Sequence, residues 1–179
     1  MLTVNDTMLI LIDAQGKLFN AMSGREELQK NMQRLLEGLK VLDVPVVVTE
    51  QNPNGLGPTL EELTALLSQY NPLEKKCFSC CQAPHIMNAV KDARRPNILL
   101  AGIEMHVCVY MTCAELLAHG YKVEIVADAV SSRSEFNRNV GLQKCLALGA
   151  SITCVETALF ELLQTAEHEH FKAISKIIR

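Results

Sequence analysis

Short apolar runs alternate along this chain with longer segments in which apolar residues recur every three or four positions. An uninterrupted apolar run is typical of a strand that is buried on both faces of a parallel sheet. The run at 8–12 has no polar residue, and the run at 44–49 is rich in β-branched residues, which favour strands. We expect six strands, at 8–12, 44–49, 73–79, 97–101, 123–127 and 152–155.

The segments between these runs show the spacing of amphipathic helices. Within 26–42, apolar residues recur at helical spacing from Leu28 to Leu39, and charged side chains occupy the other side. Thr59 and Glu62 fit a capping box, in which a threonine hydroxyl and a glutamate three residues later bind free backbone N–H groups. We therefore expect a helix from Thr59 through 67, and further helices at 108–119, 135–148, 157–164 and 171–178.

This alternation predicts an α/β protein in which crossover helices cover both faces of a parallel sheet. The chain has 179 residues, of which 49% are apolar, and this is enough to build one hydrophobic core. We expect a single domain over residues 1–179, with a loop rich in Gly and Pro at 52–58.

Charged side chains are mixed along the sequence. The 20 acidic and 17 basic residues give a formal net charge of −3, so no basic surface is available to bind a nucleic acid. Charges also interrupt every apolar segment before it reaches the roughly 20 residues that a membrane span requires. We expect neither a nucleic acid nor a membrane as partner.

The cysteines indicate a reducing environment. There are seven of them, an odd number, and several lie inside segments with helical spacing. Such thiols fit a reduced core better than a framework of disulfides. The first residues, from Met1 to Asp6, lack the basic start and apolar run of a secretory signal, so we expect a cytoplasmic protein.

Three residues with complementary chemistry lie in or after predicted strands. Ligands of an open parallel sheet bind outside the carboxyl ends of its strands, where Asp13, Lys75 and Cys108 are expected. We expect Cys108 to open a helix, where partial positive charge lowers the pKa of a thiol and favours the thiolate. The carboxylate of Asp13 can take a thiol proton, and the ammonium of Lys75 can hold that carboxylate in place.

Other polar residues have competing interpretations. Cys77 and Cys80 form a C-x-x-C pattern beside Cys81, which is found in dithiol redox proteins and in half of a zinc site, but no second pair completes a metal site. Arg133 can bind a substrate carboxylate or pair with an acid such as Glu135 at a helix start, and we favour the pairing.

Three side chains are candidates for the wall of a substrate pocket. Phe19 lies a few residues beyond the first strand, and Met105 and His106 shortly precede Cys108. Ordinary core packing is an equal alternative for Phe19, and a place at a helix start or on the surface is an equal alternative for His106.

The motifs that carry these residues resemble the isochorismatase-like cysteine hydrolases over nearly the whole chain. The matching pieces are Leu11-Ile12-Asp13-Ala14-Gln15, then Lys75-Lys76-Cys77-Phe78-Ser79, which is similar to the K-x-x-F-S of that family, and Gly102-Ile103-Glu104-Met105-His106-Val107-Cys108-Val109. They occur in the family's order. Segments at 49–57 and 128–133 resemble one subgroup of uncharacterised isochorismatase-domain proteins.

This resemblance implies a three-layer fold with a doubly wound sheet of six parallel strands in the order 3-2-1-4-5-6. It implies a catalytic triad of Cys108 as nucleophile, Asp13 as proton acceptor and Lys75. It also implies a cis peptide bond between Ile103 and Glu104. The backbone N–H groups of Glu104 and Cys108 then form an oxyanion hole, in which each donor is often worth roughly 3 kcal/mol of barrier. The implied reaction is hydrolysis of a small amide or related acyl compound through a cysteine thioester.

The sequence lacks residues that two groups of enzymes in that family carry. Its metal-dependent amidases share an Asp-x-His after the second strand, where this chain has Glu50-Gln51-Asn52. We therefore expect no metal, no other cofactor and no metal-dependent nicotinamidase activity. Isochorismate-cleaving members carry glycine at the position of Cys108, which argues against isochorismate as substrate.

Two further functions are open at this point. A catalytically idle family member can serve as an oligomeric scaffold that binds partners, and Cys77 with Cys80 can serve as a redox dithiol. For the hydrolase, the partner is a small-molecule substrate. The resemblance and the apolar segment at 171–178 also predict a homo-oligomer, either a dimer or a larger assembly.

Overall fold

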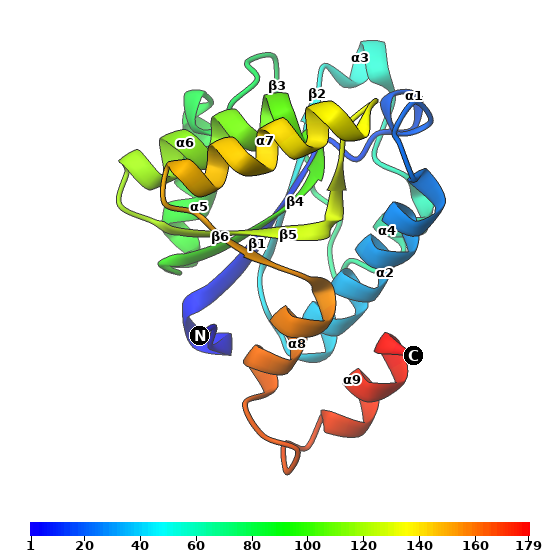
Figure 1. Ribbon diagram of the computed structural model, residues 1–179, viewed down its shortest axis with the longest axis vertical. Helices are drawn as coiled ribbons and strands as arrows, with labels where there is room; N and C mark the ends of the chain where they lie inside the picture. Colours follow the sequence, from blue (N-terminus) through cyan, green and yellow to red (C-terminus); the bar gives the residue numbers. More distant parts are fainter.

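The computed structural model describes residues 1–179 and contains one sheet of six parallel strands (Figure 1). The strands are β1 (Thr7–Ile12), β2 (Val46–Gln51), β3 (Leu73–Lys75), β4 (Asn97–Ile103), β5 (Lys122–Ser131) and β6 (Ser151–Thr153). They pair in the order β3-β2-β1-β4-β5-β6, and every pair is parallel. The α/β fold class and the strand order are therefore confirmed.

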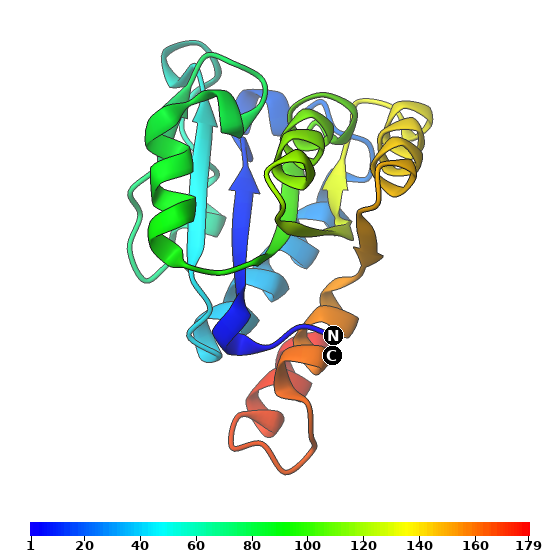
Figure 2. The same cartoon turned by 90° about the vertical axis from the view of Figure 1, so that its left-hand side faces the viewer.

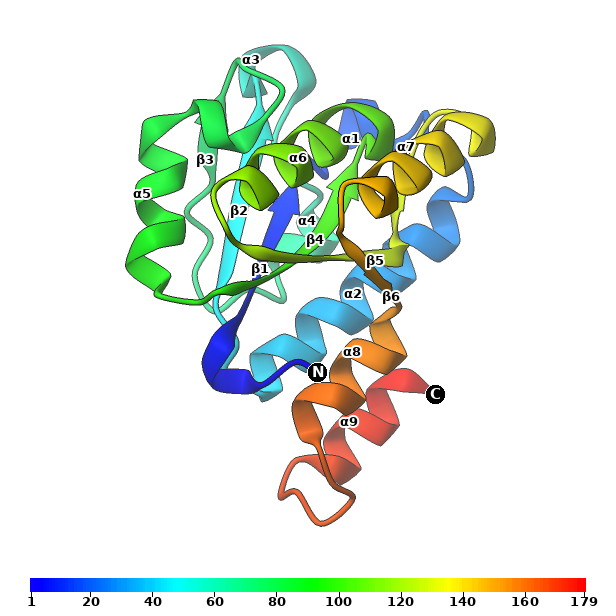
Figure 3. The same ribbon diagram turned by 60° about the vertical axis from the view of Figure 1, so that its left-hand side comes forward.

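Helices lie on both faces of this sheet (Figures 1 and 3). One face carries α5 (Pro84–Ala93), α6 (Tyr110–Ala118) and α7 (Glu135–Ala147), and the other carries α2 (Arg25–Val41), α8 (Val155–Leu163) and α9 (Phe171–Ile178). Short turns of helix lie in the connections, namely η1 (Val4–Asp6), α1 (Gly16–Phe19), α3 (Pro53–Leu56), α4 (Glu61–Thr64) and η2 (Cys80–Gln82). A π-helical turn, η3 (Met105–Val109), runs directly into α6.

Strand β1 shows why each face of the sheet has a core of its own. Successive side chains of a strand point to opposite faces. Leu9 and Leu11 pack in the core beneath α2, whereas Met8, Ile10 and Ile12 pack in the core beneath α6. Every residue of β1 is buried, which explains the uninterrupted apolar run in the sequence.

The central strands extend beyond their predicted ends. Strand β2 continues to Gln51, and β4 continues to Ile103. Strand β5 reaches Ser131 because it pairs with β4 again after a shift in register between Leu100 and Gly102. The extensions of β2 and β5 carry these strands into polar segments that the apolar pattern had excluded.

The edge strands are shorter than predicted. Strand β3 pairs with β2 over only three residues, so 76–79 leaves the sheet and leads into η2. Strand β6 ends at Thr153, and the predicted strand residue Val155 instead begins helix α8. An edge strand has only one neighbour, so fewer pairing hydrogen bonds hold its ends in the sheet.

The capping box predicted at Thr59 is wrong. The hydroxyl and the backbone N–H of Thr59 both donate to Oε1 of Glu50, at 2.8 and 2.7 Å. The helix α4 begins after Leu60 and lasts for only four residues. Because the hydroxyl of Tyr70 also donates to Glu50, this buried carboxylate ties the 59–70 connection to the end of β2.

Helix α5 was missed by the sequence analysis. It begins at Pro84, since proline is well tolerated in the first turn of a helix, and it buries Ile86, Met87 and Val90. A helix of ten residues repeats the apolar spacing too few times to stand out in the sequence.

Both ends of the chain lie at the amino ends of the strands, opposite the edge where the strands finish (Figure 2). The backbone N–H of Leu2 donates to Glu161 on α8 at 2.8 Å. At the other end, α9 packs with Ile174 fully buried and with Phe171 beside Phe160, their ring centroids 6.3 Å apart. The predicted amphipathic segment therefore packs on its own domain. None of the helices combines the length and the apolar character that crossing a lipid bilayer demands.

Candidate active site

The carboxyl ends of β1, β2 and β3 gather polar side chains inside the apolar interior. Nζ of Lys75 lies 2.6 Å from Oδ2 of Asp13, and both side chains are fully buried. The hydroxyl of Thr49 donates to the other carboxylate oxygen of Asp13 at 2.8 Å. Lys75 also donates to Oε1 of Gln51 at 2.9 Å. These hydrogen bonds compensate both ions for the water that they have lost.

Asp13 is the first residue after β1. Its φ of 51° places it in the left-handed region, which Asp tolerates better than most residues. Its backbone N–H donates to the carbonyl oxygen of Thr49 at 3.1 Å, which prolongs the contact between β1 and β2 by one residue. The chain therefore turns at Asp13 while the residue stays beside β2.

Gln15 fixes the end of β2 where this network meets Lys75. Its side-chain amide accepts from the N–H of Gln51 at 2.7 Å, donates to the carbonyl oxygen of Gln51 at 3.1 Å, and also donates to the carbonyl oxygen of Gly57. The side chain is completely buried. Gln15 thus holds the backbone of Gln51, while the side chain of Gln51 accepts a hydrogen bond from Lys75.

Cys108 lies in η3, beside the Lys75–Asp13 pair, and is only 6% exposed. Burial raises the pKa of its thiol, and the negative charge of Asp13 raises it further, against the lowering effect of Lys75. The expected thiolate is therefore wrong for the resting protein, because desolvation outweighs the helix dipole. The helical turn also begins earlier than predicted, at Met105, so Cys108 does not open it.

Lys75 is a cation at neutral pH. Burial acts to lower its pKa, but the negative charge of Asp13 and the interactions with Cys108 and Cys80 outweigh burial, and the pKa is raised above its ordinary value. The pair with Asp13 is thus an ion pair in a dry environment.

The backbone has three unusual features at the junction between β4 and η3, close in sequence to Cys108. A cis peptide bond joins Ile103 to Glu104. The N–H of Glu104 donates to no protein acceptor, and the N–H of Cys108 donates to none outside its own helical segment. Gly102 has a φ of 126°, and a Cβ there would lie 2.0 Å from the carbonyl oxygen of Ile12. Only glycine therefore allows β4 to approach β1 so closely at this end of the sheet.

Two contacts tie η3 to the end of β5. Oε2 of Glu104 accepts from the backbone N–H of Arg133 at 3.0 Å and from its Nε at 3.1 Å. Nδ1 of His106 lies 2.9 Å from the hydroxyl of Ser132. Arg133 therefore pairs with an acid, as favoured from the sequence, but the acid is Glu104 and not Glu135.

The three candidate pocket residues occupy different places. Phe19 is buried in the core beneath α2, on the opposite face of the sheet from Cys108. Met105 is fully buried in the same core as Cys108, and His106 is half-buried. Phe19 thus packs the far core, whereas Met105 and His106 belong to the turn that carries Cys108.

Cys80 is buried beside the ion pair. Its Sγ lies 3.9 Å from Oγ1 of Thr49, and its backbone N–H donates to the hydroxyl of Thr112 at 3.0 Å. Burial raises the pKa of Cys80 to about 11. None of the seven cysteines forms a disulfide.

Sequence reasoning missed four residues of this network, namely Gln15, Thr49, Gln51 and Cys80. One available signal was position, because Thr49 and Gln51 occur at the carboxyl end of the second strand and Gln15 follows Asp13. The inward direction of Cys80 had no such signal, because it depends on how the connection after β3 folds back onto α6.

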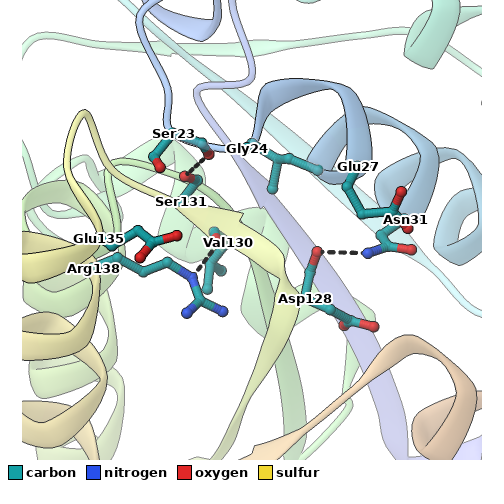
Figure 4. Close-up of a pocket in the computed structure, with 10 residues that line it drawn as sticks. Ser23, Gly24, Glu27, Asn31, Asp128, Val130, Ser131, Glu135 and Arg138 are labelled. Carbon is teal, nitrogen blue, oxygen red and sulfur yellow. Dashed lines mark hydrogen bonds between the residues drawn. The ribbon is translucent and has the colours of Figure 1, made fainter.

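A separate polar cleft lies between α2, β5 and α7 (Figure 4). Its polar groups bind one another, through the contacts Ser131–Ser23, Asn31–Asp128 and Arg138–Val130. None of Cys108, Asp13 and Lys75 lines it. No set of three or more His, Cys, Asp or Glu side chains in the structure is arranged to hold a metal ion.

Comparison with known proteins places this arrangement in a family. The model of the isochorismatase domain matches residues 7–157. Isochorismatase domain-containing protein 2A of Mus musculus is 37% identical over 175 residues, which cover 97% of this chain and 82% of that protein.

Solved structures of similar proteins share the fold of this chain. MAR1 ribonuclease from Caenorhabditis elegans is 34% identical, with a TM-score of 0.93 over 99% of this chain and 91% of that chain. The YcaC gene product of Escherichia coli, described as an octameric hydrolase of unknown specificity, has a TM-score of 0.94 over 99% of this chain and 88% of that chain. At 20% identity, YcaC shows the shared fold alone. Because the family model spans most of the chain and the mouse relative aligns along nearly all of it, this protein belongs to the isochorismatase family of hydrolases.

Proposed function

We propose that this protein hydrolyses a small amide or a related acyl compound, with Cys108 as nucleophile, Asp13 as proton acceptor and Lys75 as the cation paired with Asp13. The observation that carries the proposal is the buried contact of 2.6 Å between Lys75 and Asp13, beside a thiol that is protonated at rest. A buried carboxylate next to a thiol is the arrangement that general-base activation of a cysteine requires.

The order of the proposed steps follows from which groups hold protons at rest and which can accept them. As Sγ of Cys108 attacks the carbonyl carbon of the substrate, Asp13 takes the thiol proton, so that no free thiolate has to exist in the dry site beforehand. The developing oxyanion is stabilised by the N–H groups of Glu104 and Cys108. Asp13 then passes the proton to the departing nitrogen, and the carbon–nitrogen bond breaks to leave a thioester on Cys108. Water, deprotonated by Asp13, releases the acid and restores the thiol.

The scaffold and redox alternatives are less well supported. Desolvating the two ions of a salt bridge costs several kcal/mol for each ion, and an idle scaffold has no use for a buried pair of this kind. A redox dithiol needs an attacking thiol with a lowered pKa, whereas burial raises the pKa of Cys80 to about 11.

Substitution of Cys108 tests the mechanism. Release of ammonia or free acid from a panel of small amides, esters and acyl compounds is measured for the wild type, Cys108→Ala and Cys77→Ala, with circular dichroism as the check on folding. Cys108→Ala should lose all turnover, and Cys77→Ala, which alters a half-buried thiol outside the ion pair, should keep it. Full activity in Cys108→Ala would exclude the thioester, and loss of activity in Cys77→Ala alone would favour the dithiol.

We also propose that the protein self-associates. The support for this proposal is the neighbour from Escherichia coli, which is described as octameric. Sedimentation velocity should give a mass that is a multiple of 19.8 kDa. A single species at the mass of one chain would contradict this.

A further inference from the structure

Two residues of β2 hold the Lys75–Asp13 pair from one side. Thr49 and Gln51 are two positions apart, so their side chains leave the strand on the same face. Oγ1 of Thr49 lies 2.8 Å from Oδ1 of Asp13, and Oε1 of Gln51 lies 2.9 Å from Nζ of Lys75. The strand thus places one side chain against each of the two charged groups.

Counting protons fixes the direction of the hydrogen bonds at Thr49. An ionised carboxylate only accepts hydrogen bonds, so the single hydroxyl proton of Thr49 goes to Asp13. The lone pairs of the same oxygen then accept from the thiol of Cys80, whose Sγ is 3.9 Å away. Because Lys75 donates to Oδ2 of Asp13, each carboxylate oxygen of Asp13 has one side-chain donor.

Cys80 is itself anchored to the helix that continues from Cys108. Its backbone N–H donates to the hydroxyl of Thr112 at 3.0 Å, and Thr112 lies four residues after Cys108, about one turn further along. Cys80 is 1% exposed, and Thr49 and Thr112 are fully buried. The line from Cys80 through Thr49 to Asp13 is therefore dry, and hydrogen bonds are stronger in a dry environment than in water.

We propose that Thr49, braced by the thiol of Cys80, is a positioning residue that holds the carboxylate of Asp13 ready to accept the proton of Cys108. This inference rests on the proposed function, in which Asp13 is the proton acceptor. It gives Cys80 a role as a hydrogen-bond donor that involves no oxidation, and so accounts for one thiol of the C-x-x-C pattern.

The proposal has a consequence for pH dependence. A carboxylate that loses a hydrogen-bond donor binds a proton more tightly. The groups that face Asp13 are Lys75 from β3, Cys108 from η3 and Cys80 from η2, and the pKa values of all three are raised above their ordinary values of 10.5, 9.0 and 9.0. None of them therefore titrates below neutral pH. A loss of Cys108 reactivity in the acid range would therefore come from its proton acceptor and not from these three groups.

Alkylation of Cys108 by iodoacetamide tests this without any substrate. The rate is followed by mass spectrometry from about pH 3 to about pH 9, a range that starts below the ordinary pKa of an aspartic acid side chain. Thr49→Val keeps the shape of the side chain and removes the hydroxyl, so the acid midpoint should rise by about one pH unit, with a roughly tenfold lower rate below the midpoint. Thr49→Ser keeps the hydroxyl and should restore the wild-type profile.

Three further variants complete the design. Cys80→Ala removes the brace and should shift the midpoint in the same direction by a smaller amount, and Cys80→Ser should reverse that shift because serine also donates. Thr153→Val removes another buried threonine hydroxyl, on β6 and outside the network, and should leave the midpoint unchanged.

The outcomes separate the two proposals. If Cys108→Ala keeps the wild-type turnover of the amide and acyl panel, the proposed function fails. If the wild type shows the acid midpoint but folded Thr49→Val and Cys80→Ala both keep it, the positioning role is excluded while the proposed function stands. If Thr49→Val does not fold, an unchanged midpoint in Cys80→Ala overturns the inference.

Discussion

Nζ of Lys75 and Oδ2 of Asp13 are 2.6 Å apart, and neither side chain has any area exposed to solvent. Removing one member of such a pair leaves the other charge buried alone, which costs about 3–5 kcal/mol. Lys75→Met should therefore lower the free energy of unfolding in urea by about that amount. The double variant Lys75→Met/Asp13→Asn carries neither charge and should recover most of the loss. A double variant as unstable as the single one would contradict this account.

The pH dependence of stability should reflect Asp128, which lies in the cleft of Figure 4. Burial raises the pKa of its carboxyl above the ordinary value of 3.8. A raised pKa in the folded state stabilises the protein below the unfolded pKa, and that contribution is lost as the pH rises through the folded pKa. At neutral pH the charge of Asp128 is therefore unfavourable.

Asp128→Asn should accordingly raise the urea midpoint at about pH 7, and the difference should disappear near pH 3. Asparagine keeps an oxygen that can accept from the N–H of Val155, which lies 2.9 Å from the carboxylate, so the start of α8 retains its partner. Asp92→Asn, at an exposed position on α5, is the matched control and should leave the midpoint unchanged. A gain that persists unchanged at acid pH would show that the charge is not its source.

Gly102 and Gly24 both have positive φ values, yet their replacement by alanine should differ in effect. A Cβ at Gly102 would lie 2.0 Å from the backbone oxygen of Ile12, in the centre of the sheet, whereas a Cβ at Gly24 would meet nothing within 4 Å. Gly24→Ala should cost about 1 kcal/mol through backbone strain alone. Gly102→Ala should cost more than about 3 kcal/mol or prevent folding. Equal thermal melting temperatures for the two variants would contradict the packing assigned to β1 and β4.

RNA is a substrate that the charge of this chain argues against. Protein–RNA affinity depends mainly on Lys and Arg contacts with phosphates, and this chain has a net charge of −3. Incubation with single-stranded RNA should produce no cleavage that Cys108→Ala abolishes. Cleavage that depends on Cys108 and weakens with salt would instead favour a ribonuclease.

The centre of the sheet could be predicted from sequence because β1 and β4 are buried on both faces. The residues of β1 read as a continuous apolar run, and the helical spacing before β2 identifies the crossover α2. The exceptions have physical causes. Thr59 has the chemistry of a helix cap, but the buried carboxylate of Glu50 binds both of its donors instead, and no local pattern reports a partner nine residues away.

The candidate site could be predicted only in part. Asp13, Lys75 and Cys108 were selected as candidates because each lies near a strand end and belongs to a recognisable motif. The protonation of Cys108 was predicted with the wrong sign, since the sequence indicates a helix start but not how deeply the thiol is buried. Thr49 and Cys80 were not found because their contacts join β2 to the connection after β3, across a distance in sequence that no motif spans.

Both termini lie at the amino ends of the strands, away from the carboxyl ends where Asp13, Lys75 and Cys108 lie (Figure 2). A fusion partner or surface tether attached at either Met1 or Arg179 should leave the opposite rim of the sheet open to the medium. The protein can therefore be immobilised by either tail for substrate screening.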